Sequence, residues 1–195
     1  MALKLLTASV TEPVALEEIQ NFLRISDEPD VTILTDMISA ARKRAETITR
    51  RQLKTATWEL RLDAFMDVIR LPMAPLQSVT SVKYLDTSGV EQTLTENTDY
   101  IVDTYSEPAR ITPAYACVWP PTYSILHAVR IVFVAGYGDD DTDVPEPIRN
   151  WIKTFIGAMY ENRETIFVSN ITQGVNELTF LDGLLDDYRV WGADT

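Results

Sequence analysis

Residues 129–164 read VRIVFVAGYGDDDTDVPEPIRNWIKTFIGAMYENRE and combine a strand, an acidic loop and a helix. The first seven residues are rich in β-branched side chains, which is typical of a buried strand. Gly136-Tyr137-Gly138 ends the strand, and an acidic loop with two prolines leads into the helix. The apolar residues of the helix recur at helical spacing: Ile148, Trp151, Ile152, Phe155, Ile156, Met159 and Tyr160. None of this resembles a catalytic motif, so the stretch indicates an assembly protein.

Composition limits the class of protein. The chain has 195 residues, is 46% hydrophobic and carries a net charge of −12. A chain of this length can bury its own core, so we expect one domain, with or without an appendage. The acidity argues against a free-standing nucleic-acid-binding protein, which would carry a basic patch. An acidic wall would instead repel DNA and let it slide.

Cysteine content and the N-terminal residues indicate where the protein folds. Cys117 is the only cysteine, so no intrachain disulfide can form and a reducing compartment is the simplest interpretation. The first residues, MALKLLTASVTEP, lack the long apolar region of a signal peptide. No apolar run approaches the ~18 residues of a membrane span. We therefore expect a soluble protein made in a cytoplasm.

Helices are predicted for residues 15–54. A short amphipathic helix is indicated by Leu16, Ile19, Phe22 and Leu23, and a second helix follows a break at residues 26–30. Arg50 and Arg51 are expected in the last turn of the second helix, where cations complement the helix dipole.

A β region is predicted for residues 57–135. Apolar and polar residues alternate from residue 57 to residue 64, which is typical of a half-buried strand. Asp86-Thr87-Ser88-Gly89 reads as a hairpin turn between two strands. Further strands are expected at residues 68–71, 79–85, 90–94, 100–103, 110–112 and 128–135. The last is apolar on both faces, so we expect it at the centre of the sheet.

The expected fold class is α+β. A long helix at residues 146–163 joins the N-terminal helices in a small bundle, with the β region inserted, and residues 1–164 form this domain. Residues 165–195 are expected to form a C-terminal assembly arm, because they carry too much apolar surface for a solvated tail. A last helix folded back on its own domain is the alternative.

Candidate chemistry is sparse, and we predict no catalytic residue, metal or cofactor. The carboxylates around Asp139–Asp143 lack the ligand spacing of a calcium loop. His127 is the only histidine, and no nucleophile motif surrounds the nearby Ser124. Cys117 lies among apolar residues and is expected to be buried. A small hydrolase using carboxylates such as Glu59, Asp63 and Asp67 stays open, because the separation of such groups is spatial.

Opposite charges offer a contact between copies of the chain. A basic helix and an acidic loop on one chain can pair head to tail, and such a contact closes into a ring if the rotation allows. The candidate subunit-contact residues are Arg42, Lys43, Arg50, Arg51, Asp139, Asp140 and Asp141. A solvated helix face is the alternative for the cations.

Several short matches spread along most of the chain resemble one family. They are Leu6-Thr7, Pro13-Val14-Ala15-Leu16-Glu17-Glu18, Ala40-Ala41-Arg42, Ala45-Glu46, Thr57-Trp58-Glu59-Leu60, Leu71-Pro72, Pro75-Leu76-Gln77-Ser78-Val79, Val82-Lys83-Tyr84-Leu85-Asp86, Gly89, Trp119-Pro120, Ala135-Gly136-Tyr137-Gly138, Val144-Pro145, Tyr160-Glu161-Asn162-Arg163-Glu164 and Tyr188-Arg189-Val190-Trp191. In order and spacing they resemble the head–tail connector (adaptor) proteins of long-tailed bacteriophages, also labelled possible DNA-packaging proteins. Ala15 departs from the pattern, which has Thr or Ser before Leu-Glu-Glu, so the first helix lacks a complete capping box.

The resemblance implies a structural role in a virion neck, reached from the host cytoplasm during assembly. About twelve copies would form a ring under the portal protein, extend the DNA channel without binding DNA specifically, and dock a stopper or other tail-side neck protein. The arm would then contact the portal through Ile166, Phe167, Ile171, Leu181, Leu185, Tyr188, Arg189 and Trp191. The alternatives are a stopper, a tail terminator or the hydrolase.

Overall fold

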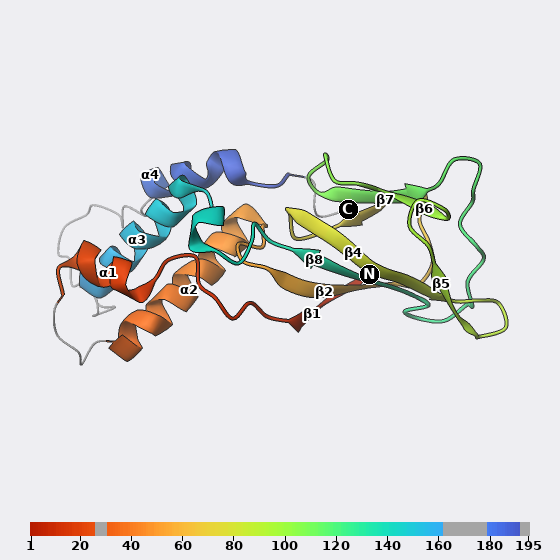
Figure 1. Cartoon of the computed structure of the whole chain (residues 1–195), viewed down its shortest axis with the longest axis horizontal. Coiled ribbons are helices and arrows are strands. Elements are labelled where there is room, and N and C mark those ends of the chain that lie inside the picture. The colour runs from red at the N-terminus through yellow and green to blue at the C-terminus, as the bar shows by residue number, and fades with distance from the viewer. Residues whose placement is uncertain (26–30, 162–178, 192–195) are drawn as a thin grey trace, which may run out of the picture. The chain divides into compact units, whose positions relative to one another are not determined.

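The computed structural model describes residues 1–25, 31–161 and 179–191. The chain divides into two compact units, which we name the β unit and the helical unit. The β unit comprises Met1–Val10, Arg50–Asp139 and Val190–Thr195, and the helical unit comprises Thr11–Thr49 and Asp140–Arg189. Figure 1 shows the helices of one unit and the strands of the other, and each unit is described by itself.

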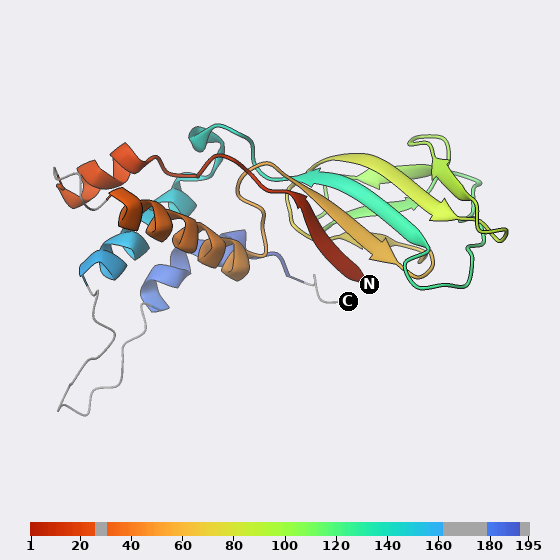
Figure 2. The same ribbon diagram turned by 90° about the horizontal axis from the view of Figure 1, so that it is seen from below.

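The larger sheet of the β unit has five antiparallel strands. Its order is β1-β2-β8-β4-β5, with β8 in the centre as the apolar run at 128–135 predicted. Figure 2 shows β8 (blue-green) between β2 (orange) and β4 (yellow), with β1 (dark red) at the edge. The strands are β1 (Ala2–Thr7), β2 (Ala56–Leu62), β8 (Val129–Ala135), β4 (Leu76–Leu85) and β5 (Glu91–Leu94).

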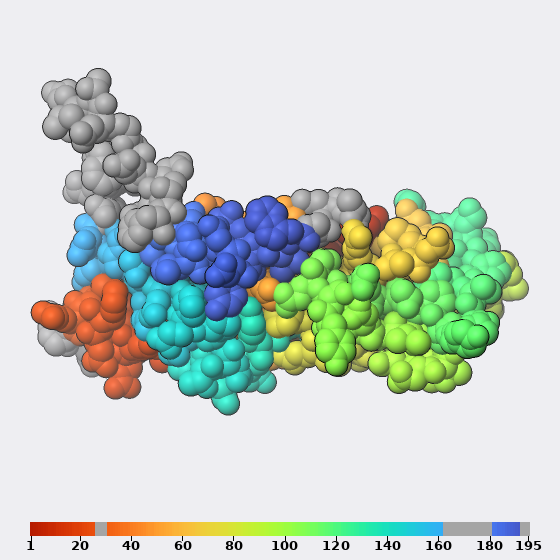
Figure 3. Space-filling model, turned by 90° about the horizontal axis from the view of Figure 1, so that it is seen from above, coloured from red at the N-terminus to blue at the C-terminus, as the bar shows by residue number. Residues whose placement is uncertain are grey.

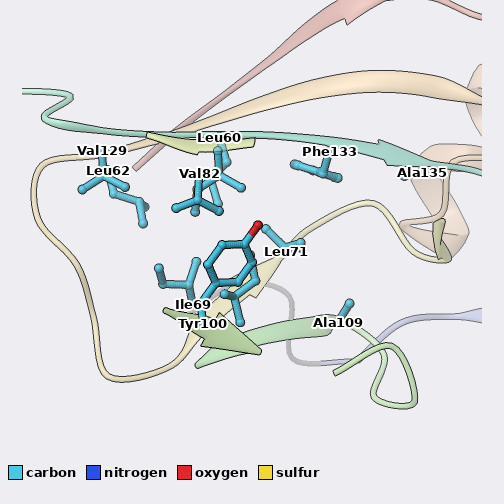
Figure 4. Packing of buried hydrophobic residues seen from close by; sticks show 12 residues of the cluster. Leu60, Leu62, Ile69, Leu71, Val82, Tyr100, Ala109, Val129, Phe133 and Ala135 are labelled. Carbon is cyan, nitrogen blue, oxygen red and sulfur yellow. The ribbon is translucent and has the colours of Figure 1, made fainter. Parts of the chain in front are cut away.

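A smaller sheet packs against the larger one and closes the core of the β unit. It contains β3 (Ile69–Leu71), β7 (Ala109–Pro113) and β6 (Tyr100–Asp103) in that order. Side chains on β8 alternate between buried and half-buried, as expected where only one face of a sheet meets a core. Figure 4 shows the buried cluster, including Leu60, Val82, Tyr100 and Phe133, between the two sheets.

The helical unit contains α1 (Leu16–Leu23), α2 (Val31–Thr49), α3 (Glu146–Glu161), α4 (Thr179–Asp182) and the 3-10 helices η2 (Asp141–Asp143) and η3 (Gly183–Tyr188). Its core is built by apolar residues at helical spacing: Ile19, Leu34, Ile38, Ala41, Ala45, Ile148, Trp151, Ile152, Ile156, Leu181 and Leu185. Ala15 occupies the N-cap of α1, where its methyl group cannot accept a hydrogen bond. Within the described residues, no helix is long and apolar enough to cross a membrane.

The structure corrects two predicted boundaries: the end of the helical region 15–54 and the start of the β region. Helix α2 ends at Thr49, because Arg50 adopts a left-handed conformation with φ 56°. Arg50 and Arg51 therefore lie beyond the last turn of α2 and begin the second segment of the β unit. The N-terminal strand β1 was not predicted, and it extends the β unit beyond the expected range of 57–135.

The expected boundary of a C-terminal arm at residue 165 also changes. Leu181 and Leu185 are buried in the helical unit, and the indole Nε1 of Trp151 donates a hydrogen bond to Asp182 Oδ1 at 3.1 Å. Residues 179–189 thus pack as part of the helical unit, which is the alternative that the sequence left open. Residues 162–178 lie outside the described part of the chain.

Candidate assembly surfaces

The candidate catalytic groups do not form a constellation. The carboxylate of Asp63 accepts a hydrogen bond from the backbone N–H of His127 at 2.9 Å, while its distance to the imidazole Nδ1 is 4.0 Å. Asp63 therefore holds the loop at His127, which has a φ of 63°. Glu59 is nearly buried and pairs with Arg61 at 2.7 Å. These carboxylates stabilise strands and loops of the β unit.

The acidic loop is held by hydrogen bonds of its own carboxylates and of Lys54. Asp140 and Asp143 form a reciprocal capping box around η2, and the backbone carbonyl of Asp139 accepts a hydrogen bond from the buried Lys54 Nζ at 2.6 Å. Asp141 lies 4.0 Å from Arg149. Among residues 1–25, 31–161 and 179–191, no group of three acidic, His or Cys side chains could hold a metal ion.

The glycines before this loop allow a close approach of two backbones. An added Cβ at Gly136 would lie 2.6 Å from the carbonyl carbon and oxygen of Lys54, and the φ of Gly136 is +129°. The backbone N–H of Thr55 donates to the carbonyl of Gly138 at 3.2 Å. Gly136-Tyr137-Gly138 is therefore a packing motif of the β unit.

The candidate basic residues differ in how available they are. Arg42 is engaged within the helical unit, where its Nε lies 2.7 Å from Glu12 and its Nη1 lies 3.2 Å from Glu46. Arg51 is nearly buried in the β unit and pairs with Glu107. Lys43 and Arg50 are exposed. Arg42 and Arg51 thus serve their own chain.

Contacts within the helical unit also use charged groups. The carboxylate of Glu18 on α1 accepts hydrogen bonds from Arg149 and Lys153 on α3, each at 2.8 Å. Partial burial alone would raise the pKa of Glu18, but the hydrogen bonds from Lys153 and Arg149 overcome this effect and lower the pKa from its usual value. The ion pairs join the first and third helices of the unit.

The candidate portal-contact residues fall into three groups. Leu181 and Leu185 are buried, and Figure 3 shows the segment that contains them (blue) against α3 (cyan). Tyr188 and Arg189 are half-buried, while Trp191 is 75% exposed. The remaining candidates, Ile166, Phe167 and Ile171, lie outside the described residues.

An exposed apolar loop in the β unit was not predicted. Tyr115, Val118 and Leu126 are 96%, 86% and 72% exposed in the segment between β7 and β8. Cys117 is exposed in the same loop, so its predicted burial is wrong. The apolar residues of this loop do not recur at helical or strand spacing, so the sequence could not separate its buried positions from its exposed ones.

Cations gather on the outer face of the five-stranded sheet, and this surface was also missed. Arg61, Arg130 and Lys83 lie on three adjacent strands, because Arg130 is the register partner of both Arg61 and Lys83. Register partners in a sheet project from the same face. The pattern is recognisable only when the pairing of distant strands is known.

Comparison with known proteins gives matches of fold. No family model matches the chain, and no curated protein matches it. A chain in the neck of an empty gene transfer agent particle, computed with C6 symmetry, matches with a TM-score of 0.78 and 22% identity over 97% of this chain and 96% of that chain. A chain in the virion of the native particle matches with a TM-score of 0.77 and 21% identity over the same shares.

A third match comes from the neck of the native particle computed with C12 symmetry. Its TM-score is 0.69 at 23% identity, with 97% of this chain and 96% of that chain covered. These three structural neighbours are components of gene transfer agent particles. The chain therefore shares, over almost its whole length, the fold of a component of a phage-like particle.

Proposed function

We propose that the protein is a non-enzymatic structural component of the neck of a phage-like virion. The fold match over 97% of the chain to a neck structure carries the proposal. The charge pairs and carboxylates described above support it, because they stabilise the fold and do not converge on a reaction centre. The same match favours a virion component over the hydrolase, for which the paired Glu59 and the loop-holding Asp63 offer no support.

Within the neck, we assign the protein the role of head–tail adaptor. About twelve copies would form a ring under the portal protein, extend the DNA channel and dock a stopper or other tail-side protein. The resemblance of the sequence to adaptor proteins supports this role, and the C12 symmetry of one neighbouring neck structure agrees with the copy number. The exposed Trp191 is the described candidate for portal contact, since aromatic residues are enriched at binding hot spots.

Coexpression with the portal protein tests the adaptor role. The adaptor is expected to copurify with the portal protein and to add a ring to it in electron micrographs. The Trp191→Ala variant should copurify less, while a Val10→Ala variant, which changes another exposed apolar side chain, serves as the control. Binding to the tail tube without the portal would identify a tail terminator instead. Binding only to a preformed portal–adaptor complex would identify a stopper.

A further inference from the structure

The five-stranded sheet carries an excess of positive charge on its outer face. Its five strands contain four cations, Lys4, Arg61, Lys83 and Arg130, and two carboxylates, Glu59 and Glu91. Their side chains point away from the core, because their strand neighbours Leu60, Leu62, Val82 and Ile131 are buried. Arg61, Lys83 and Arg130 are 43%, 33% and 36% exposed. We name these four cations the basic sheet face.

Such an arrangement opposes sheet stability. Like charges directly opposite one another on paired strands are destabilising, and Arg130 faces a cation on each side. Two carboxylates reduce this repulsion: Glu59 lies 2.7 Å from Arg61, and Glu91 lies 3.0 Å from both Lys83 and Arg130. Two carboxylates do not balance four cations, so the face retains a surplus of positive charge. Local arrangements that cost stability are expected at functional sites.

The negative charge of the chain is concentrated in the other unit. Counted over the described residues, the helical unit contains 7 basic and 13 acidic residues, a net charge of −6, whereas the β unit contains 9 basic and 10 acidic residues, a net charge of −1. Carboxylates of the helical unit reach solvent, among them Glu146 and Asp186, whose side chains are 68% and 61% exposed. The helical unit thus carries a surplus of negative charge, and the sheet face of the β unit carries a surplus of positive charge.

We propose that the basic sheet face of one copy docks on the acidic helical unit of a second copy. The inference rests on the proposed ring and names the surface that joins its subunits. Two different complementary surfaces make a head-to-tail contact, which is the kind that closes into a ring. Complementary charge also steers association and fixes the register of the contact. The sheet face takes the basic role that the charge pattern predicted for Arg42, Lys43, Arg50 and Arg51. Of these, Arg42 and Arg51 pair with carboxylates of their own chain.

A nucleic acid is the less suitable occupant. Glu59 and Glu91 lie within the face and would repel phosphates, and the rest of the chain is strongly acidic. A carboxylate-bearing protein surface can be arranged to meet the four cations and avoid the two carboxylates. DNA offers a uniform line of phosphates and cannot be arranged in this way.

The test uses the full chain and two matched double substitutions. Lys83→Gln/Arg130→Gln removes two cations from the sheet face without adding negative charge beside Glu91. Arg70→Gln/Arg110→Gln removes a cross-strand cation pair from the smaller sheet, where these residues are register partners. Thermal melting identifies any variant that fails to fold. A Lys83→Ala/Arg130→Ala variant is the replacement if the first pair misfolds.

Sedimentation equilibrium at about 0.03 M and about 0.5 M salt measures self-association, since screening is weak in the first condition and strong in the second. At low salt the chain is expected to exceed its monomer mass of 22.0 kDa and to return towards it at high salt. The sheet-face variant should associate roughly tenfold more weakly, and the control variant should associate as the parent does. The same three proteins are then counted per portal ring by native mass spectrometry.

The outcomes separate this inference from the proposed function. Equal association and equal portal stoichiometry of all three proteins would overturn the docking surface and leave the adaptor role standing. The docking surface is also overturned if the parent stays at its monomer mass of 22.0 kDa and both variants still give complete rings on the portal protein. If the parent fails to bind the portal protein, the adaptor role is wrong, whatever the sheet face does in solution. Binding of a short DNA duplex that is lost only in the sheet-face variant would identify DNA as the occupant and overturn the proposal.

Discussion

Replacing Trp151 with Ala should remove a large part of the stability of the helical unit. Trp151 is 1% exposed, and its ring stacks on Phe155 with centroids 4.7 Å apart. Truncating a buried Trp or Phe to Ala typically lowers the free energy of unfolding by about 3–5 kcal/mol, because packing is lost and a cavity stays. The hydrogen bond to Asp182 is lost as well. The carboxylate of Asp182 keeps some access to water, so this loss adds little.

The assay is urea denaturation followed by circular dichroism at helical wavelengths. A loss of about 3–5 kcal/mol is a large share of the ~5–15 kcal/mol that stabilises a typical domain. The transition of the helical unit should therefore move to much lower urea concentration. Because the β unit has its own core, two separate transitions are expected in the variant.

Two further substitutions make the result interpretable. Trp151→Phe keeps most of the ring and loses the N–H, so its cost should be well below that of the Ala variant. Trp191→Ala removes the same side chain from a site that is 75% exposed, and its effect on stability should stay within about 0.5 kcal/mol. If Trp151→Ala unfolds within about 1 kcal/mol of the parent, the reasoning from burial is refuted and the stripe on α3 does not form the core.

Three other predictions concern single sites. Gly136→Ala should lower the melting temperature strongly, because its Cβ would lie 2.6 Å from backbone atoms of Lys54; an unchanged melting curve would contradict the close approach. The pKa of Glu18 is lowered in the folded state, so its stabilising effect is present above its unfolded value near 4.5 and is lost as pH falls through the folded value. In the Glu18→Gln variant, the free energy of unfolding should therefore fall less steeply with decreasing pH than in the parent. Equal slopes for the two proteins would show that the pairing with Arg149 adds nothing. Cys117 should react with a thiol reagent in the folded protein as fast as in urea, whereas slow reaction until unfolding would indicate burial.

Local sequence patterns predicted two kinds of element. One kind pairs with a strand that is near in sequence, and the other carries a long run of apolar or periodic residues. The stripe from Ile148 to Ile156 predicted α3, and Asp86–Gly89 predicted the hairpin of β4 and β5, in which Gly89 has a φ of 80°. The apolar run of β8 predicted its central place. These signals suffice because helical and strand periods are properties of the segment itself.

The missed features depend on contacts between distant segments. Strand β1 is short and pairs with β2, in which every register partner lies at least fifty residues further along the chain, so nothing in ALKLLT fixes its partner. Arg51 looked like a helix-dipole cation, but its partner Glu107 lies in a distant loop. The basic sheet face exists only through the register of β2, β8 and β4. Charge patterns read along the chain therefore located a basic helix and missed the sheet.

The division of the helical unit into two chain segments determines the order in which the protein can fold during synthesis. Helices α1 and α2 leave the ribosome early, but α3 begins at Glu146, about a hundred residues after α2 ends. At ~5–20 residues per second, the apolar stripe of α2 waits roughly 5–20 seconds for its partner. The β unit is meanwhile completed up to Asp139 and has its core available first. The nascent α2 therefore carries Leu34 and Ile38 without the cover of α3 during this interval. Transiently exposed apolar surface of this kind is what chaperones protect from aggregation.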